Sequence, residues 1–237
     1  MCQLLVRGSI IQPKASCKYL GVFLDQNLNF QEEVKYVLKK MAAGIKTIQS
    51  IKVVLPIKTR ILLMNALVLS HLHYPAVLLN GISNNLCISL EKQLSWAIKT
   101  CCNRLKYDSS TDLKLKYQVL PIRYFLNAKS LFHFWKIFHK KLPAYSNLVY
   151  PTHRIDKNDR TGRLYFNMKS KSQALDNCFF KLSVDLWNST YLTVDIGQLT
   201  SSLRTKHKIK KFFFHEFEKN HDTIAYGKLS WRAFKFN

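Results

Sequence analysis

The sequence predicts a mainly α-helical protein: a small N-terminal β-hairpin unit, then a helical bundle, then a basic helical C-terminal region. Residues 3–25 run apolar in short bursts, which is typical of short strands. Beyond them, apolar residues recur at helical spacing over several long segments. The hydrophobic content of 47% supports a folded core. We therefore divide the chain into a β unit at 1–30, a helical domain at 31–150 and a basic linker with C-terminal helices at 151–237.

The first helix is expected in "NFQEEVKYVLKKMAAGIKTIQSI", residues 29–51. Asn29 is a candidate N-cap, and the carboxylates of Glu32 and Glu33 suit the positive end of the helix dipole. Val34 and Val37 open an apolar stripe. A different face of the same helix carries Lys35, Lys39 and Lys46.

The second helix is expected from Pro56, as its first residue, to about Leu79, with Gly81 ending it. It is apolar nearly all round, so we expect it to be central. Four polar residues interrupt its apolar run, which favours a helix in a soluble core over a membrane span. They are Asn65, Ser70, His71 and His73.

Further helices are expected at 86–105, with Leu90, Leu94, Ile98 and Cys101 buried, and at 122–142, where Pro143 ends the helix. Between them, residues 106–120 form a polar connector with a possible short helix. Residues 151–172 are polar and basic, so we expect a surface linker or loop. A short helix near 175–188 and a last basic helix at 196–218 complete the chain.

The charge of the chain is its most unusual property, because 37 Lys and Arg face 14 Asp and Glu, a formal net charge of +23. No acid occurs between Glu33 and Glu91, or between Asp112 and Asp156. This pattern favours a polyanion, nucleic acid first of all, over a merely solvated surface. The candidate phosphate-binding residues are Lys35, Lys39, Lys40, Lys46, Arg204, Lys206, Lys208, Lys210 and Lys211.

The acidic residues argue against metal-dependent catalysis. Two-metal sites need at least two converging carboxylates, and the sequence has no Asp-Asp pair. His71 and His73 are two residues apart on a helix and cannot bind one metal together. We therefore predict no catalytic residue, no metal site and no cofactor. The remaining route to catalysis is a pocket that joins Asp25, a histidine and a cysteine.

The cysteines predict an intracellular protein, nuclear or cytoplasmic. They form no C-x-x-C pair, so neither a zinc site nor a disulfide framework is indicated, and buried, reduced thiols are expected. The N-terminus has no signal-peptide pattern. The six residues are Cys2, Cys17, Cys87, Cys101, Cys102 and Cys178.

The stretch "KYLGVFLD" reads as one strand with apolar groups on both faces, as in a buried strand. Gly21 would let another backbone approach closely, and Asp25 would end the strand and begin the turn into the first helix. The wider stretch "KYLGVFLDQNLNFQEEV" resembles the segment that follows the catalytic core in reverse transcriptases of non-LTR (LINE-type, jockey-like) retrotransposons. The marker residues in it are Lys18, Tyr19, Leu20, Gly21, Val22 and Asp25.

The resemblance continues along most of the chain. "LPIKTRILLMNALVLSHLHYPAVL" is similar to a thumb helix of that family, and "VLPIRYFLNAKSLFHFWKIFHKKLPAYSNLV" to its post-thumb helix. "SVDLWNSTYLTVDI" resembles the family's "LWN-x-LP-x-x-I", without the proline. The marker residues there are Leu186, Trp187 and Asn188.

The resemblance implies a primer-grip hairpin, a thumb-like bundle and a C-terminal region. The thumb would contact a template–primer duplex of RNA and DNA, and Lys35 and Lys39 lie on the helix suited to that contact. In the family the metal-binding aspartates lie upstream of this segment, so Mg²⁺ would belong to a catalytic core that these residues do not supply. One hypothesis is thus a catalytically incomplete, nucleic-acid-binding fragment or relic of such an enzyme. The alternative is a structural or protein-interaction module without a nucleic-acid role, whose helices would pack against an upstream polymerase domain. No membrane partner is expected.

Overall fold

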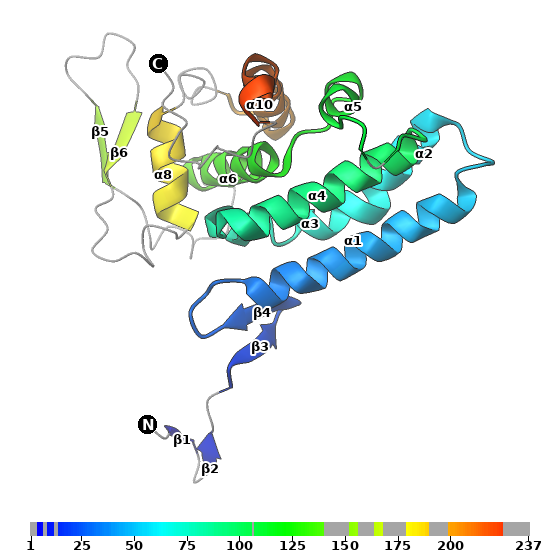
Figure 1. Ribbon diagram of the computed structural model, residues 1–237. Coiled ribbons are helices and arrows are strands. Elements are labelled where there is room, and N and C mark those ends of the chain that lie inside the picture. The colour runs from blue at the N-terminus through cyan, green and yellow to red at the C-terminus, as the bar shows by residue number, and fades with distance from the viewer. Residues whose placement is uncertain are drawn as a thin grey trace.

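The computed structural model describes residues 4–6, 9–11, 14–105, 107–139, 152–155, 164–167, 179–189 and 199–224. Helices dominate these residues, which confirms the predicted mainly α-helical class (Figure 1). Their strands form three separate antiparallel pairs. The pairs are β1 (Leu4–Val6) with β2 (Ser9–Ile11), β3 (Ser16–Tyr19) with β4 (Val22–Asp25), and β5 (Thr152–Ile155) with β6 (Leu164–Asn167).

The stretch "KYLGVFLD" is a hairpin, so the prediction of a single buried strand is wrong. Tyr19 pairs with Val22, and Leu20 and Gly21 between them have φ of 46° and 88°. Two consecutive positive φ angles are the pattern of a type I′ turn, which matches the twist of a two-stranded ribbon. A Cβ on Gly21 would meet only the ring of Tyr74, at 3.9 Å. The glycine therefore serves the turn, and it does not make room for another backbone.

Asp25 joins the hairpin to the first helix, as expected from the sequence. One carboxylate oxygen accepts the backbone N–H groups of Asn27 and Asn29, at 3.1 and 2.9 Å, and the other accepts that of Phe30, at 2.7 Å. The predicted N-cap at Asn29 is wrong, because Phe30, at φ 57°, precedes the helix and no side chain caps it. The carboxylate of Asp25 instead accepts the backbone N–H groups of the linker that leads into the helix.

Helix α1 (Gln31–Ile51) holds the hairpin through a buried carboxylate. Glu33 is almost fully buried, and its Oε2 accepts the backbone N–H of Phe23 at 2.9 Å. The sequence explained this glutamate by the helix dipole alone. Its main partner is instead a strand ten residues earlier, because folding brings β4 against the first turn of α1.

The expected helix from Pro56 to Leu79 is not continuous. It comprises α2 (Ile57–Met64), a π-helical segment η1 (Asn65–Leu69), α3 (Ser70–His73) and, after a turn, the 3₁₀-helix η2 (Leu78–Gly81). Pro75 ends α3, because it has no N–H to donate and its ring crowds the preceding turn. Pro56 is the N-cap residue of α2, one position before the helix, and Gly81 is the last residue of η2.

The π-helical segment lies against α1 at an unusually close approach. A Cβ on Gly44 would stand 2.5 Å from the carbonyl oxygen of Leu67. Only glycine leaves room for the two helix backbones at this point. One face of the α2–α3 stretch is buried, with Met64, Val68 and Leu72 in the core, while Leu62 on another face is exposed. The helix that was expected to be central is thus buried on one face only.

Helix α4 (Asn84–Cys101) packs against α1 and buries Leu90, Leu94, Ile98 and Cys101, as predicted. The short helix α5 (Thr111–Lys116) lies in the connector, also as predicted, and α6 (Ile122–Phe138) follows. Pro143, the predicted stop, lies outside the described residues. Helices α8 (Phe179–Ser189) and α10 (Ser202–Ile224) complete the fold. The predicted linker at 151–172 contains the strand pair β5–β6, so its description as a loop is wrong.

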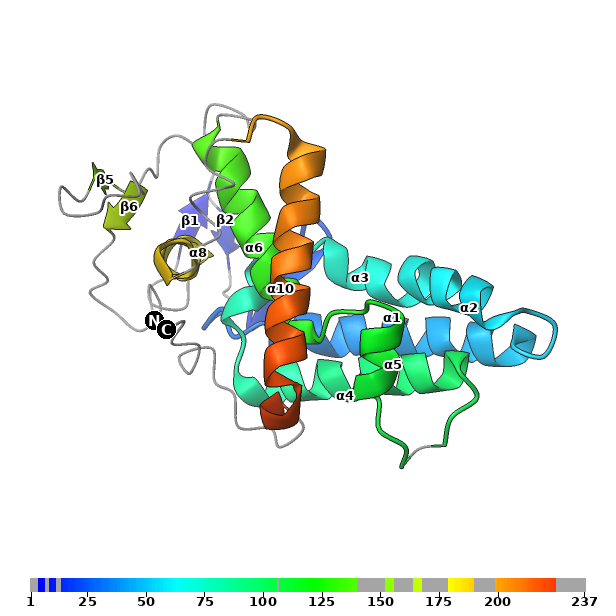
Figure 2. The same cartoon turned by 90° about the horizontal axis from the view of Figure 1, so that it is seen from above.

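Two hydrophobic cores meet at α6. The first is mainly aliphatic and fills the space between α1, α2–α3 and α4. The second is mainly aromatic and joins α6 to α8 and α10. The ring of Phe125 packs against both. Figure 1 shows the resulting order in space, with α1 and the β3–β4 hairpin at the bottom, α4 and α6 in the middle and α10 at the top. Seen from above, α10 passes in front of α6 (Figure 2). No described helix is long and apolar enough to cross a membrane.

Candidate nucleic-acid interface

Four of the predicted phosphate-binding lysines lie on the outer face of α1. Lys35, Lys39, Lys40 and Lys46 are all exposed, while the opposite face packs into the aliphatic core. Lys35 is not a free cation, because its Nζ lies 2.6 Å from Oε1 of Glu32. Both partners are exposed, so this pair contributes little to stability and a phosphate can replace the carboxylate.

The β3–β4 hairpin adds a fifth cation to this face. Lys18 Nζ lies 4.9 Å from the ring centroid of Tyr36 and 5.4 Å from that of Phe23. Lys40 Nζ lies 5.5 Å from the Tyr36 centroid, and the Phe23 and Tyr36 rings are 5.5 Å apart. We call this area the α1–hairpin surface; it comprises Lys18, Lys35, Tyr36, Lys39, Lys40 and Lys46.

The sequence pointed to Lys18 as a family marker and did not place it in the site. The sequence signal that could have placed Lys18 in the site is the turn "YLGV", which brings β3 beside β4. Because β4 packs against α1, the hairpin folds back on the first helix. Tyr36 was missed for a different reason. On α1 this residue lies between the apolar stripe and the lysine face. Only its contacts with the hairpin show that it belongs with the lysines.

The second predicted group, on α10, is exposed but does not form one face. Thr205, Ile209 and Phe213 mark the side of α10 that packs into the aromatic core. The five basic residues occupy the remaining arc, at positions that point in different directions. Arg204, Lys208 and Lys211 share one side of it, and Lys206 and Lys210 share the other.

The two predicted groups do not combine into a single site. Helix α1 packs against α4, whereas α10 packs against α6. Consequently α4 and α6 lie between α1 and α10 (Figure 1). The sequence grouped these lysines by composition, and the fold places them on two sides of the protein.

Lys129 and Lys136 are half-buried where α10 meets α6, beside the exposed Lys206 and His73. Burial first, and then the positive charges of Lys206 and Lys136, lower the pKa of Lys129 to about 8. Partial burial, and then the charges of Lys129 and Lys206, lower the pKa of His73 to about 4. Phe125 orders two of these groups: Lys129 Nζ lies 5.4 Å from its centroid, and the His73 ring meets it edge-on at 5.1 Å. The sequence did not single out Lys129 or Lys136.

The C-terminal marker residues lie in or beside the aromatic core. Trp187 in α8 is buried in the aromatic core, with its ring centroid 5.4 Å from that of Phe134 and 5.8 Å from that of Phe138. Leu186 packs against the same core, and Asn188 is half-buried beside it. The motif "LWN" therefore holds α8 on α6.

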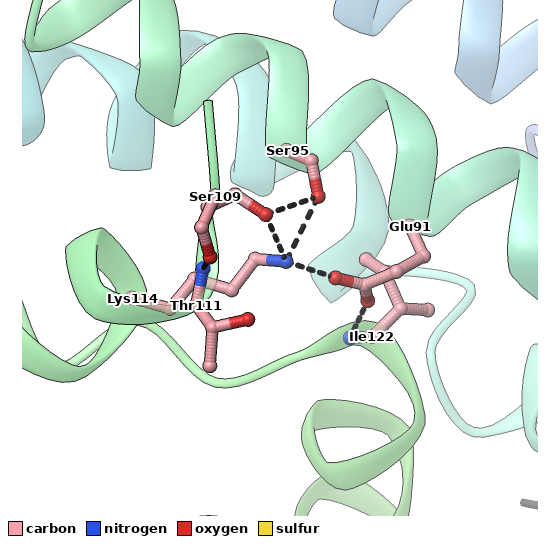
Figure 3. Close-up of polar contacts among 7 residues, drawn as sticks. Glu91, Ser95, Ser109, Thr111, Lys114 and Ile122 are labelled. Atoms are coloured by element: carbon pink, nitrogen blue, oxygen red, sulfur yellow. Dashed lines mark hydrogen bonds and ion pairs between the residues drawn. The ribbon is translucent and has the colours of Figure 1, made fainter. Parts of the chain in front are cut away.

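A buried ion pair joins the helices between the two surfaces (Figure 3). Lys114 of α5 is buried, and its ammonium group pairs with Oε1 of Glu91 in α4 and donates to the hydroxyl of Ser95 at 2.8 Å. Glu91 Oε2 accepts the backbone N–H of Ile122 at 2.6 Å. One carboxylate thus neutralises a buried ammonium and satisfies the first turn of α6, which is an arrangement for stability.

Three of the described thiols are poorly suited to nucleophilic catalysis. Burial raises the pKa of Cys101 to about 12, and burial also raises the pKa of Cys87 and Cys102. Such groups stay protonated at neutral pH. Cys17 is exposed, so the expectation of buried thiols is wrong for that residue, while Cys2 and Cys178 lie outside the described residues. Among the residues that the structure describes, no three His, Cys, Asp or Glu side chains form a metal-binding group.

The chain matches no protein-family model, no curated protein and no solved structure. The functional argument therefore depends on the residues and contacts described above.

Proposed function

We propose that the chain is a catalytically incomplete, thumb-like segment of a non-LTR retrotransposon reverse transcriptase, and that it binds a template–primer duplex of RNA and DNA through the α1–hairpin surface. The observation that carries this proposal is the arrangement of Lys18 and Lys40 over the Tyr36 ring, beside the exposed lysines of α1. A cation–π contact holds a lysine in place while its charge stays available to an anion.

The length of the surface suits a duplex. Lys35 and Lys46 are eleven residues apart, which corresponds to about 16 Å along a helix axis. Phosphates of one strand follow each other about every 3.4 Å along a duplex, so the row spans roughly five of them. Carboxylates are scarce here, because α1 contains no acid after Glu33 and neither does the following stretch up to Glu91. A polyanion is therefore attracted along the whole face.

The family resemblance supports the same surface. The segment that resembles the primer-grip hairpin forms a real hairpin, and its Lys18 contacts the helix that resembles the start of the thumb. In this proposal the magnesium ions and the catalytic aspartates belong to a different part of the polymerase. The segment contributes affinity for the duplex and does not contribute chemistry.

A salt series with an RNA–DNA duplex tests the proposal. We expect the logarithm of the association constant to fall linearly with the logarithm of salt concentration. Lys18→Gln with Lys40→Gln should weaken binding and reduce the slope by about 2, because each duplex phosphate contact contributes about 0.9. The matched control removes the exposed Lys58 and Lys92, as Lys58→Gln with Lys92→Gln. A dissociation constant that stays millimolar at low salt, or equal effects of both pairs, contradicts the proposal.

A second candidate function, a protein-interaction module, rests on Leu20. This leucine is 74% exposed and has a positive φ, so it is unfavourable both as surface and as a turn residue. Its carbonyl oxygen accepts the hydroxyl of Tyr74 at 2.7 Å, which fixes the turn against α3. A polymerase domain that covers the turn would explain the leucine.

The variant Leu20→Asn separates the two candidates, because asparagine suits the first position of a type I′ turn. We expect the isolated chain to be stabilised. If the turn is a docking surface, the variant should also bind a separately produced upstream polymerase domain more weakly, in a titration followed by sedimentation. Duplex binding by the isolated chain should not change. Unchanged domain binding would remove the second candidate.

A further inference from the structure

The contact between α6 and α10 holds three lysines that no described carboxylate neutralises. Lys129 and Lys136 come from α6 and Lys206 comes from α10, and none of the three takes part in the ion pairs of the described residues. Helix α6 has no acidic residue along its whole length. The nearest aromatic rings are on α6 itself: Lys129 lies 5.4 Å from the Phe125 centroid and Lys136 lies 4.9 Å from the Phe132 centroid.

Crowding of these cations costs stability, and an anion would remove that cost. Lys129 and Lys136 are half-buried, so water screens their repulsion less than it does for the lysines of α1. Burial is the first cause of the lowered pKa of Lys129 and of His73, and repulsion from the neighbouring lysines is the second. A site that keeps like charges together without a counterion is arranged for a ligand of the opposite charge.

We propose that Lys129, Lys136 and Lys206 form a second phosphate-binding site, separate from the α1–hairpin surface, that holds a further stretch of the same nucleic acid. This inference rests on the proposed function for the identity of the polyanion. Lys129 and Lys136 are seven residues apart, or about 10 Å along α6. That spread is longer than a single phosphate group, so it suits a strand that carries several phosphates. An extended strand therefore fits the site better than one compact anion does.

The position of the site indicates which part of the nucleic acid it takes. It lies on the α10 side of α6, next to His73 at the end of α3, and α1 and α10 are on opposite sides of the fold (Figure 1). The rings of Phe125 and Phe132 are occupied by lysines, so they order cations and do not stack with bases. The site therefore contacts backbone phosphates and is indifferent to sequence. A single-stranded extension of the template, continuing from the bound duplex, fits this description.

Binding assays with two probes test the inference. One probe is a blunt RNA–DNA duplex of twelve base pairs, and the other is the same duplex with a single-stranded RNA extension of fifteen nucleotides. The test variant is Lys129→Gln with Lys206→Gln, and the control is Lys58→Gln with Lys92→Gln. For the extended probe we expect the test pair to weaken binding about tenfold or more. Its salt slope should fall by about 1.4, because each single-strand contact contributes about 0.7. The blunt duplex should bind this test variant and this control variant equally well.

Thermal stability distinguishes a binding site from a structural one. We expect Lys129→Gln with Lys206→Gln to raise the melting temperature of the free protein, because it removes crowded like charges. A lower melting temperature together with weaker binding of both probes would mean that the lysines only support the fold. That outcome overturns the inference.

The remaining outcomes separate the two proposals. If Lys18→Gln with Lys40→Gln weakens both probes while Lys129→Gln with Lys206→Gln changes neither, the second site is wrong and the proposed function stands. If only the α6–α10 pair has an effect, the α1–hairpin surface is wrong. Vesicles with 30% phosphatidylserine provide a further check. Binding to them that depends on Lys129 and Lys206, without any effect on the RNA extension, would assign the site to a membrane surface and overturn the inference.

Discussion

The bundle of α1 to α4 and the group of α6, α8 and α10 place their positive charge in different ways. The first presents lysines on an exposed helix face above an aliphatic core. The second crowds lysines against half-buried aromatic rings, above an aromatic core. Water and salt screen the repulsion among the exposed lysines of the first region. In the second region the repulsion among the lysines destabilises the protein until a counterion binds. Both regions are basic, so composition does not distinguish them. The burial of their lysines decides what each surface can bind.

Removal of the main aromatic anchor tests whether the two regions depend on each other. Trp187→Ala should reduce the free energy of unfolding by about 3–5 kcal/mol, because it deletes a large buried ring between α8 and α6. Urea denaturation followed by circular dichroism measures this loss. We expect the blunt duplex to bind nearly unchanged under native conditions. A complete loss of duplex binding in the folded variant would show that the α1–hairpin surface requires the aromatic core.

The carboxylate of Glu91 in α4 contacts both α5 and the first turn of α6. Glu91→Ala should reduce the free energy of unfolding by about 3 kcal/mol, because it leaves the ammonium of Lys114 buried without its counterion. It also removes the acceptor for the Ile122 N–H. The matched test is a double-mutant cycle with Lys114→Met, in which the two losses should be far from additive. Additive losses would mean that the pair does not couple the helices.

The close contact of α1 with η1 belongs to the first region alone. At an exposed helical position Gly→Ala stabilises a helix by about 1 kcal/mol. Gly44→Ala should instead destabilise the protein by about 1–3 kcal/mol, because the new Cβ meets the Leu67 carbonyl oxygen and forces the helices apart. Denaturant midpoints with an unchanged slope would measure this. A stabilised variant would show that the two helices separate easily.

The smallest expected effect is the pH dependence of the crowded lysines. Lys129 has a folded pKa of about 8, below its unfolded value of 10.5, so between these values the unfolded chain binds more protons. The free energy of unfolding should therefore rise with pH in that window, as the cost of burying the Lys129 ammonium and its repulsion from Lys206 and Lys136 disappear. Comparison with Lys129→Gln isolates this contribution, because other groups titrate alike in both proteins. Identical slopes would mean that the lysines are not crowded.

The same linkage between pKa and stability predicts a second pH dependence, due to His73. Its folded pKa of about 4 lies below 6.5, so stability should rise as pH increases from 4 to 6.5. His73→Gln should remove this part of the slope when thermal melts are compared across the range. A wild-type slope that survives the substitution would assign the effect to other groups.

Much of the fold could be predicted from the sequence because the relevant signals are local. Helical periodicity located α1, α4 and α6, and the uneven distribution of acids identified the basic helices. The interruption of the second helix was missed because Pro75 lies in a run that is apolar nearly all round. The strand pair β5–β6 was missed because its segment is polar and lacks a clear alternation.

The sequence by itself determined that this protein is mainly α-helical, that its helices are basic with few acids beside them, and that Asp25 lies at a turn rather than among paired carboxylates. The tertiary structure decided which cations act together. It brought Lys18 to Tyr36, separated the lysines of α10 from those of α1, and set Lys206 beside Lys129. The physical reason is that periodicity fixes the face of one helix at a time, whereas the approach of two helices depends on side chains distant in sequence, such as Gly44 and Leu67.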